Sequence, residues 1–258
     1  MTAQTATPWP SRRDLGRPAL IAHRGETLLE PENTIPAFEA AVAAGADLIE
    51  IDVKLSRDGV PVVFHDDSLA RMAGGLAGTT RDLDAEALAA VASCHPDTGR
   101  TAPIPTLVEV LAWARGRVPL LVELKTHPLL DPQAARAVGE AVRGAEGILV
   151  YSSDHAVVAE VAAAAQGIPH GLILNENTPF LGAILDDSRP ALLSQAIAVL
   201  TPSAVSAAHA RGTAVSTEVR SPEDIGLVRR LGADAVVNTK YPFAHLVEWV
   251  ASTEWGEH

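Results

Sequence analysis

The residues with the clearest chemical potential lie in the range 47–66. An apolar run there carries Glu50 and Asp52 two positions apart, a turn signal follows at 57–59, and a second apolar run ends at His65. Side chains alternate along a strand, so Glu50 and Asp52 should lie on the same side of it. Two neighbouring carboxylates in an apolar segment are unfavourable unless a positive charge lies near both. This stretch therefore predicts a cation site.

The composition limits the class of protein that could carry this site. The 258 residues are close to the roughly 250 typical of a single barrel of alternating strands and helices, and 47% are hydrophobic, as in a globular protein with a large core. A net charge of −12 argues against binding to nucleic acid or to an anionic membrane. The single cysteine excludes an internal disulfide, and no apolar run reaches the length of a membrane span. We therefore expect a cytoplasmic location and no stable membrane association.

The chain from residue 19 onwards repeats one unit, an apolar run followed by an Ala-rich helical pattern that often ends at a glycine. Such units are typical of parallel strands joined by helical crossovers. We predict eight strands, at 19–24, 47–53, 119–124, 148–152, 170–174, 196–200, 213–217 and 235–239. The helices should lie near 34–44, 106–115, 132–143, 154–165, 179–188, 203–211, 221–231 and 242–252. The fold class is then α/β, a (β/α)₈ TIM barrel.

One apolar run, at 60–65, does not fit the barrel, because it follows 47–55 too closely for a parallel crossover. The turn signal at 57–59 predicts an antiparallel hairpin between 51–55 and 60–65. The whole segment of about 53–105 should then be an insertion after the second strand that roofs the barrel mouth. Residues 1–18 lack a signal-peptide pattern and are expected to be a flexible lead-in to a single catalytic domain at 19–258.

Active sites of such barrels lie at the carboxyl ends of the strands. Seven polar residues are predicted to meet there, from the first three strands and the hairpin: His23, Arg24, Glu50, Asp52, His65, Glu123 and Lys125. Any one of them alone has a simpler structural explanation, as a rim residue or a surface ion pair. Their convergence on one end of adjacent strands favours a catalytic site.

The residue types indicate a role for each member of this set. Glu50, Asp52 and Glu123 would repel one another without a divalent cation, and oxygen ligands favour Mg²⁺ or Ca²⁺ over Zn²⁺. The cationic Arg24 and Lys125 suit a substrate phosphate beside that metal. His23 and His65 have the ordinary pKa needed to exchange protons near neutrality.

Other polar residues have weaker claims. The remaining histidines lack matched partners in the sequence and are expected to be structural or incidental: His95, His127, His155, His170, His209, His245 and His258. Glu218 and Lys240 follow the seventh and eighth strands, and we expect them at most to support the residues that contact substrate.

Several segments in order resemble the glycerophosphodiester phosphodiesterase family. They are His23-Arg24-Gly25, Pro31-Glu32-Asn33-Thr34, 45–53, 58–66, 104–111 and Glu123-Leu124-Lys125. The resemblance implies a TIM barrel with an insertion after the hairpin and a bound divalent cation, often Ca²⁺ or Mg²⁺. It further implies metal ligands at Glu50, Asp52 and Glu123, an acid–base pair at His23 and His65, and phosphate contacts from Arg24 and Lys125. Asn33 or Thr34 could also N-cap the first helix.

The second half of the chain departs from the family pattern. Residues 215–220 lack the family's tryptophan, and Lys240 stands where an aspartate is usual. The expected function is metal-dependent hydrolysis of small glycerophosphodiesters to glycerol phosphate and an alcohol, with the alcohol left open. Two alternatives are a related barrel enzyme acting on lysophospholipid or sphingolipid head groups and a non-catalytic binding barrel. The oligomeric state and the choice of metal are also left open.

Overall fold

Eight parallel strands form a closed barrel in this computed structural model, which describes residues 7–125, 132–239 and 241–255. The strands are β1 (Ala19–His23), β2 (Leu48–Leu55), β6 (Leu120–Leu124), β7 (Ile148–Ser152), β8 (His170–Leu174), β9 (Leu192–Gln195), β10 (Ala214–Val219) and β11 (Ala235–Asn238). β1 pairs with β2 on one side and with β11 on the other, which closes the sheet. The predicted TIM barrel is confirmed.

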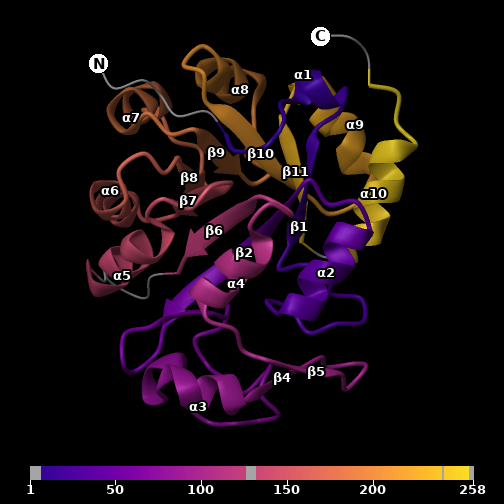
Figure 1. Cartoon of the computed structure of the whole chain (residues 1–258). Coiled ribbons are helices and arrows are strands. Elements are labelled where there is room, and N and C mark those ends of the chain that lie inside the picture. Colours follow the sequence, from indigo (N-terminus) through magenta and orange to yellow (C-terminus); the bar gives the residue numbers. More distant parts are fainter. Residues whose placement is uncertain (1–6, 126–131, 240, 256–258) are drawn as a thin grey trace.

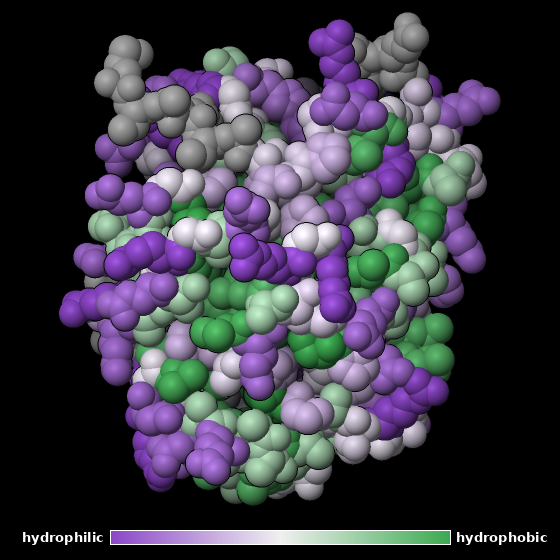
Figure 2. Space-filling view, in the orientation of Figure 1, coloured by the Kyte–Doolittle hydropathy of each residue, from purple (hydrophilic) through white to green (hydrophobic). Residues whose placement is uncertain are grey.

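Eight helices, each following one barrel strand in the chain, surround the barrel (Figure 1). They are α2 (Ile35–Ala43), α4 (Leu107–Ala114), α5 (Pro132–Val142), α6 (His155–Ala164), α7 (Leu181–Ser188), α8 (Pro202–His209), α9 (Pro222–Leu231) and α10 (Phe243–Ala251). Each overlaps a predicted helix. Figure 2 shows hydrophilic side chains projecting along the outer helices at the left of the view, as expected for faces in contact with water.

The apolar core has two layers separated by the strands. The outer layer lies between barrel and helices and includes Phe38, Val122 and Phe243. The inner layer fills the barrel towards the amino ends of its strands, with side chains such as Ile21 and Leu121. Strand residues are therefore buried on both faces, which explains why the strand sequences are apolar without alternation. Polar side chains in the barrel interior are concentrated at the carboxyl ends of the strands.

The sixth barrel strand was predicted wrongly. The prediction was 196–200, whereas the strand is Leu192–Gln195, which pairs with β8 and β10. The backbone at 196–200 turns instead, with the amides of Val199 and Leu200 both donating to the carbonyl of Ala196. Ile197 and Leu200 are buried against the outer core after this turn. An apolar run extends through both segments, so hydrophobicity alone does not locate the strand within it.

The predicted hairpin is present, because β2 pairs antiparallel with β3 (Pro61–Val63) in the register Val53 to Val63. The insertion continues through η1 (Thr80–Asp82), α3 (Ala85–Ala90), β4 (Ala92–Cys94) and β5 (Thr101–Pro103). It has its own small apolar cluster, which includes Phe64, Met72 and Leu88. In Figure 1 α3, β4 and β5 lie below the barrel, beneath α4 and α2. The 95–100 turn packs on the loop that follows β1, so the insertion borders one side of the barrel mouth.

The segment expected as a flexible lead-in contributes to the barrel over its described part. Trp9 is buried and packs in the inner core layer, and α1 (Arg12–Leu15) follows it. The Arg12 guanidinium donates to the carbonyl of Ala233. The division into a lead-in and one catalytic domain stays a prediction. Within the described residues no helix combines the length and the apolar character that crossing a membrane requires.

Candidate active site

Strand register brings the predicted residues together at the carboxyl end of the barrel. His23 on β1 lies opposite Glu50 on β2, and Asp52 on β2 lies opposite Glu123 on β6. Residues opposite one another on neighbouring strands lie about 5 Å apart, so four side chains from three strands share one small volume. Lys125 directly follows β6 at the same end.

Glu50, Asp52 and Glu123 form a compact carboxylate cluster. Glu50 and Asp52 have no solvent exposure, and one oxygen from each of the three residues lies within 4.8 Å of the others. Burial and the neighbouring Asp52 raise the pKa of Glu50 well above its ordinary value, and burial raises the pKa of Glu123. Glu50 Oε1 is buried and has no hydrogen-bond partner among the described residues. A buried acceptor without a partner among oxygen-only ligands fits a divalent cation such as Mg²⁺ or Ca²⁺.

Two cationic side chains lie against this cluster. Arg24 Nε is 3.0 Å from Asp52 Oδ2, and Lys125 Nζ is 3.1 Å from Asp52 Oδ1 and 2.8 Å from Glu123 Oε1. Burial alone would raise the pKa of Asp52, but Arg24 and Lys125 outweigh it and lower that pKa to about 2. Both cations therefore line the carboxylate site, where a phosphate oxygen would meet them.

His23 lies at the edge of the carboxylate cluster. Its Nε2 is 3.8 Å from Glu50 Oε2, and its backbone N–H donates to Asn238 Oδ1 at the end of β11. Burial lowers the pKa of His23 to about 3, with a further contribution from Arg24. The imidazole is therefore neutral at physiological pH and can accept a proton.

His65 follows the hairpin and is held by its neighbour in the sequence. Its Nδ1 is 2.7 Å from Asp66 Oδ1. A carboxylate accepts a hydrogen bond, so this contact favours the tautomer or cation with a proton on Nδ1 and directs the chemistry to Nε2. The pKa of Asp66 is lowered to about 2, chiefly by hydrogen bonds from Arg71. Arg71 was not among the predicted site residues.

Asn33 has a part in the site that was not expected from the sequence. Its Nδ2 donates to Asp52 Oδ2 at 2.9 Å, and its Oδ1 accepts from the Asp52 backbone N–H at 3.2 Å. Asn33 thus fixes a carboxylate of the cluster instead of capping a helix. Thr34 is the N-cap of α2 by backbone position, but its hydroxyl donates to the carbonyl of Pro31 and makes no capping bond. The prediction that Asn33 or Thr34 caps this helix is therefore confirmed in position for Thr34, without a side-chain capping bond among the described residues.

The turn after β1 requires glycine at position 25. Gly25 has φ +92, and a Cβ there would lie 2.7 Å from the backbone carbon of Ala37. We expect Gly25→Ala to lower the free energy of unfolding by about 2–5 kcal/mol, because it combines a disfavoured φ with a clash against backbone. Gly45→Ala is the matched control, since Gly45 has φ +96 and nothing within 4 Å of its Cβ position. Urea denaturation should give the control only the φ cost, about 1–2 kcal/mol; equal losses would contradict the clash.

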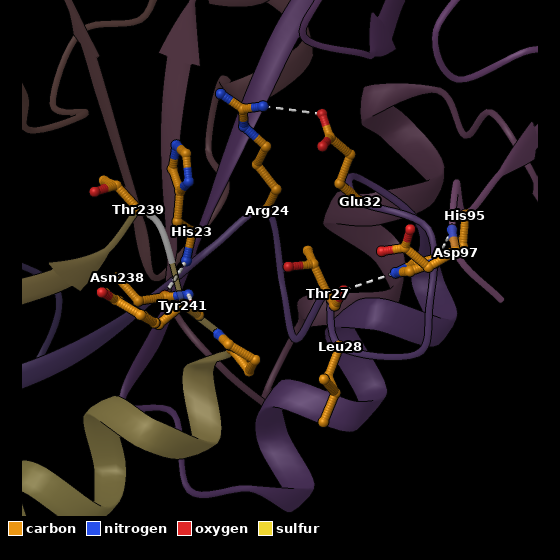
Figure 3. A pocket seen from close by; sticks show the side chains of 11 residues that line it. His23, Arg24, Thr27, Leu28, Glu32, His95, Asp97, Asn238, Thr239 and Tyr241 are labelled. Carbon is orange, nitrogen blue, oxygen red and sulfur yellow. Dashed lines mark hydrogen bonds and ion pairs between the residues drawn. The ribbon is translucent and has the colours of Figure 1, made fainter. Parts of the chain in front are cut away.

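A cavity of about 360 Å³ opens beside His23 and Arg24 (Figure 3). Its wall combines the loop after β1, the insertion, and the end of β11 with the segment that follows it, through Thr27, Leu28, Glu32, His95, Asp97, Asn238, Thr239, Tyr241 and Pro242. His95 has the structural role expected of it, because Nδ1 accepts from two backbone amides and Nε2 meets the Thr27 carbonyl at 2.9 Å. The cavity lies on the His23 side of the carboxylate cluster, and none of the three cluster carboxylates lines it.

The other residues of interest are distributed around the molecule. Glu218 accepts a hydrogen bond from Thr239 at 3.3 Å and pairs with Arg220. Since Thr239 lines the cavity, Glu218 lies behind the cavity wall. Lys240, His127 and His258 lie outside the described residues. His170 and His209 bond to Ser188 and Asp234, away from the carboxylate cluster. Besides Arg24, only Glu32 among the cavity-lining loop residues belongs to a segment that the sequence singled out, because irregular segments have no periodicity.

An α/β barrel with buried carboxylates, cations and histidines at the carboxyl ends of its strands has the form of an enzyme that acts on phosphate esters. The model of the glycerophosphoryl diester phosphodiesterase family matches residues 23–239, and the chain belongs to that family.

Curated relatives match the chain over part of their length. YhdW of Bacillus subtilis is 42% identical over 111 residues, which are 42% of this chain and 45% of that protein. The glycerophosphodiester phosphodiesterase of Caldanaerobacter subterraneus is 33% identical over 162 residues, 60% of this chain and 65% of that protein. The matches therefore span about half to two thirds of these relatives.

Solved structures resemble the whole barrel. An Oleispira antarctica phosphodiesterase, solved in complex with the product sn-glycerol-3-phosphate, has a TM-score of 0.81 and 26% identity, covering 91% of this chain and 97% of that one. The Thermotoga maritima glycerophosphodiester phosphodiesterase has a TM-score of 0.71 and 25% identity, covering 89% and 97%.

Proposed function

We propose that this protein hydrolyses glycerophosphodiesters to glycerol phosphate and an alcohol with the help of a bound divalent cation. The observation that carries the proposal is the buried cluster of Glu50, Asp52 and Glu123, flanked by Arg24 and Lys125. A diester phosphate carries one negative charge and gains another in the transition state of attack at phosphorus. A cationic site in a negatively charged protein suits that change.

Glu50, Asp52 and Glu123 would hold Mg²⁺ or Ca²⁺, which when bound supplies a Lewis acid for a phosphoryl oxygen. Arg24 and Lys125 add donors for the phosphate, and in doing so they would exchange part of their contact with Asp52 for contact with substrate. The site residues thereby neutralise the diester before any bond changes.

The two histidines would move the protons. Neutral His23 accepts the proton of the glycerol 2-hydroxyl, whose oxygen attacks phosphorus, and the bond from phosphorus to the leaving alcohol breaks. His65 gives the proton on Nε2 to the departing oxygen, while Nδ1 stays on Asp66. Water then opens the cyclic phosphate with the proton transfers reversed. The cavity beside His23, with the hydroxyl-bearing Thr27 and Thr239, supports glycerol on this side.

A solved relative supports the placing of the glycerol phosphate half of the substrate in this cavity. The Oleispira phosphodiesterase binds sn-glycerol-3-phosphate as product, and a glycerol phosphate of this size fits a cavity of about 360 Å³. The alternatives, a larger lipid diester or binding without turnover, remain as outcomes of the assay below.

The test is turnover of glycerophosphocholine with chelator, Mg²⁺ or Ca²⁺ added, beside glycerophosphoethanolamine, lysophosphatidylcholine and sphingomyelin. We expect release of glycerol phosphate that chelator reduces by about 100-fold or more and that added metal restores. Preference for the lipid substrates would select the lipid-diester alternative. Metal binding without turnover of any diester would overturn the proposal in favour of a binding barrel.

A further inference from the structure

Arg71, in the insertion, joins two neighbouring carboxylates, Asp66 after the hairpin and Glu32 in the loop after β1. Its Nε and Nη2 contact the two oxygens of Asp66 at 2.6 and 2.9 Å. Its Nη1 and Nη2 contact the two oxygens of Glu32 at 3.0 and 2.7 Å. The planar fork of a guanidinium matches both carboxylates at once, which a lysine ammonium cannot do.

Each of these carboxylates contacts one of the residues assigned to catalysis. Asp66 holds His65 Nδ1 at 2.7 Å. Glu32 Oε1 accepts from Arg24 Nη1 at 2.9 Å. Arg71 is therefore one carboxylate removed from the acid–base histidine and one carboxylate removed from the phosphate-binding arginine.

The contact between Arg71 and Glu32 joins two segments that are far apart in the sequence. Glu32 lies in the loop after β1, 39 residues before Arg71. The hydrogen bonds from Arg71 fix the orientation of both carboxylates. Without Arg71, the carboxylates of Asp66 and Glu32 are free to rotate away from His65 and Arg24. His65 would then be held only by its hydrogen bond to Asp66, a partly exposed carboxylate that Arg71 no longer fixes.

The network contributes more to geometry than to folding. The Arg71 side chain is 44% exposed, while Glu32 and Asp66 are 16% and 21% exposed. Ion pairs with this much solvent contact contribute little net stability. A loss of activity on removing Arg71 would therefore not follow from unfolding.

We infer that Arg71 is a positioning residue, which fixes the Nδ1-protonated form of His65 through Asp66 and the direction of the Arg24 guanidinium through Glu32. The inference rests on the proposed function, and it makes correct docking of the insertion a condition for catalysis. Residues that orient a catalytic group in this way typically contribute about 10–100-fold.

The test compares Arg71→Gln and Arg71→Lys with Arg100→Gln. Arg100 also ties the insertion to the loop after β1, through Glu30, and within the described residues Glu30 makes no hydrogen bond or ion pair with a predicted site residue. We expect kcat/KM for glycerophosphocholine to fall about 10–100-fold in Arg71→Gln, less in Arg71→Lys, and by less than about 2-fold in Arg100→Gln. The thermal midpoint of all three should stay within about 3 °C of the wild-type value.

A second measurement reads positioning without turnover. In protein labelled with ¹⁵N-histidine, the His65 signals are assigned by their loss in His65→Gln, and the ring nitrogens are followed at pH 8. The wild type should show the proton of the neutral ring on Nδ1, and Arg71→Gln should shift the population towards Nε2.

The outcomes separate the inference from the proposed function. An unchanged tautomer together with unchanged kcat/KM in Arg71→Gln would overturn the positioning role, as would an equal loss in Arg100→Gln. If no diester is turned over at all, the proposed function fails, while a tautomer shift confined to the Arg71 variants would still support the role of Arg71.

Discussion

Replacing Glu50 with glutamine should raise the stability of the metal-free protein. The same change should remove most of the activity measured with metal present. Glu50 is buried, one of its oxygens has no partner in the described part of the chain, and burial beside Asp52 raises its pKa. A carboxyl whose pKa is raised by folding destabilises the fold at neutral pH, by about 1.4 kcal/mol for each pKa unit. Glutamine removes that charge, but it also removes a metal ligand, and we expect kcat/KM to fall about 10²–10³-fold.

Asp52→Asn is the matched control on the same face of β2. It should lower activity similarly but destabilise the metal-free protein, by about 3 kcal/mol, because Arg24 and Lys125 then lose a buried partner. Thermal unfolding with chelator present checks both signs. Added Mg²⁺ or Ca²⁺ should stabilise the wild type by mass action and neither variant. Equal stability changes in the two variants would contradict the different charge states assigned to these carboxyls.

The two carboxyls also predict opposite dependences on pH. The stabilising ionisation of Asp52 is present above the unfolded pKa of 3.8 and is lost as pH falls towards about 2. Folding favours the protonated form of Glu50. The contribution of Glu50 to the free energy of unfolding therefore declines as pH rises above 4.5 towards its raised pKa. Glu123, Arg24 and Lys125 face the same cluster. The stability of wild type relative to Glu50→Gln, followed from pH 4 to pH 8 with chelator, should therefore decrease.

Replacing His65 with glutamine should reduce turnover of glycerophosphocholine by about 10³-fold, the scale of a lost general acid. The reduction should be much smaller for a glycerophosphodiester of p-nitrophenol, because that alcohol leaves without being protonated. His65 is directed to this role by its Nδ1 contact with Asp66, which leaves Nε2 for the leaving oxygen. Steady-state kinetics on the two substrates measures the difference.

His23→Gln is the companion variant, because a general base is needed whichever alcohol leaves. It should slow both substrates by similar factors, consistent with a pKa lowered to about 3 that keeps the ring neutral. If His23→Gln spares the p-nitrophenol substrate and His65→Gln does not, the two roles are exchanged. If neither variant loses more than about 10-fold, acid–base catalysis by these histidines is wrong.

Particular elements explain what sequence patterns could and could not predict. The hairpin of β2 and β3 was predicted because the apolar run at 60–65 follows 47–55 too closely for a crossover and a turn signal lies between them. The strand β9 was misplaced because Leu192 to Leu200 is nearly all apolar, and only pairing with β8 and β10 decides which part is extended. Asn33 or Thr34 was predicted to cap the helix because capping is local, whereas the contact of Asn33 with Asp52 depends on another strand.

The sequence by itself determined the barrel and the gathering of Glu50, Asp52 and Glu123 with their neighbouring cations and histidines. Parallel strands must present their carboxyl ends at one face, so position along a strand is enough to predict this meeting. Only the tertiary structure decided the contacts between irregular loops. The bridge from Arg71 to Glu32 and Asp66 and the cavity beside His23 depend on how the insertion docks on the loop after β1. Such loops have no periodicity in their sequence, because their conformation is fixed by the surfaces that they pack against.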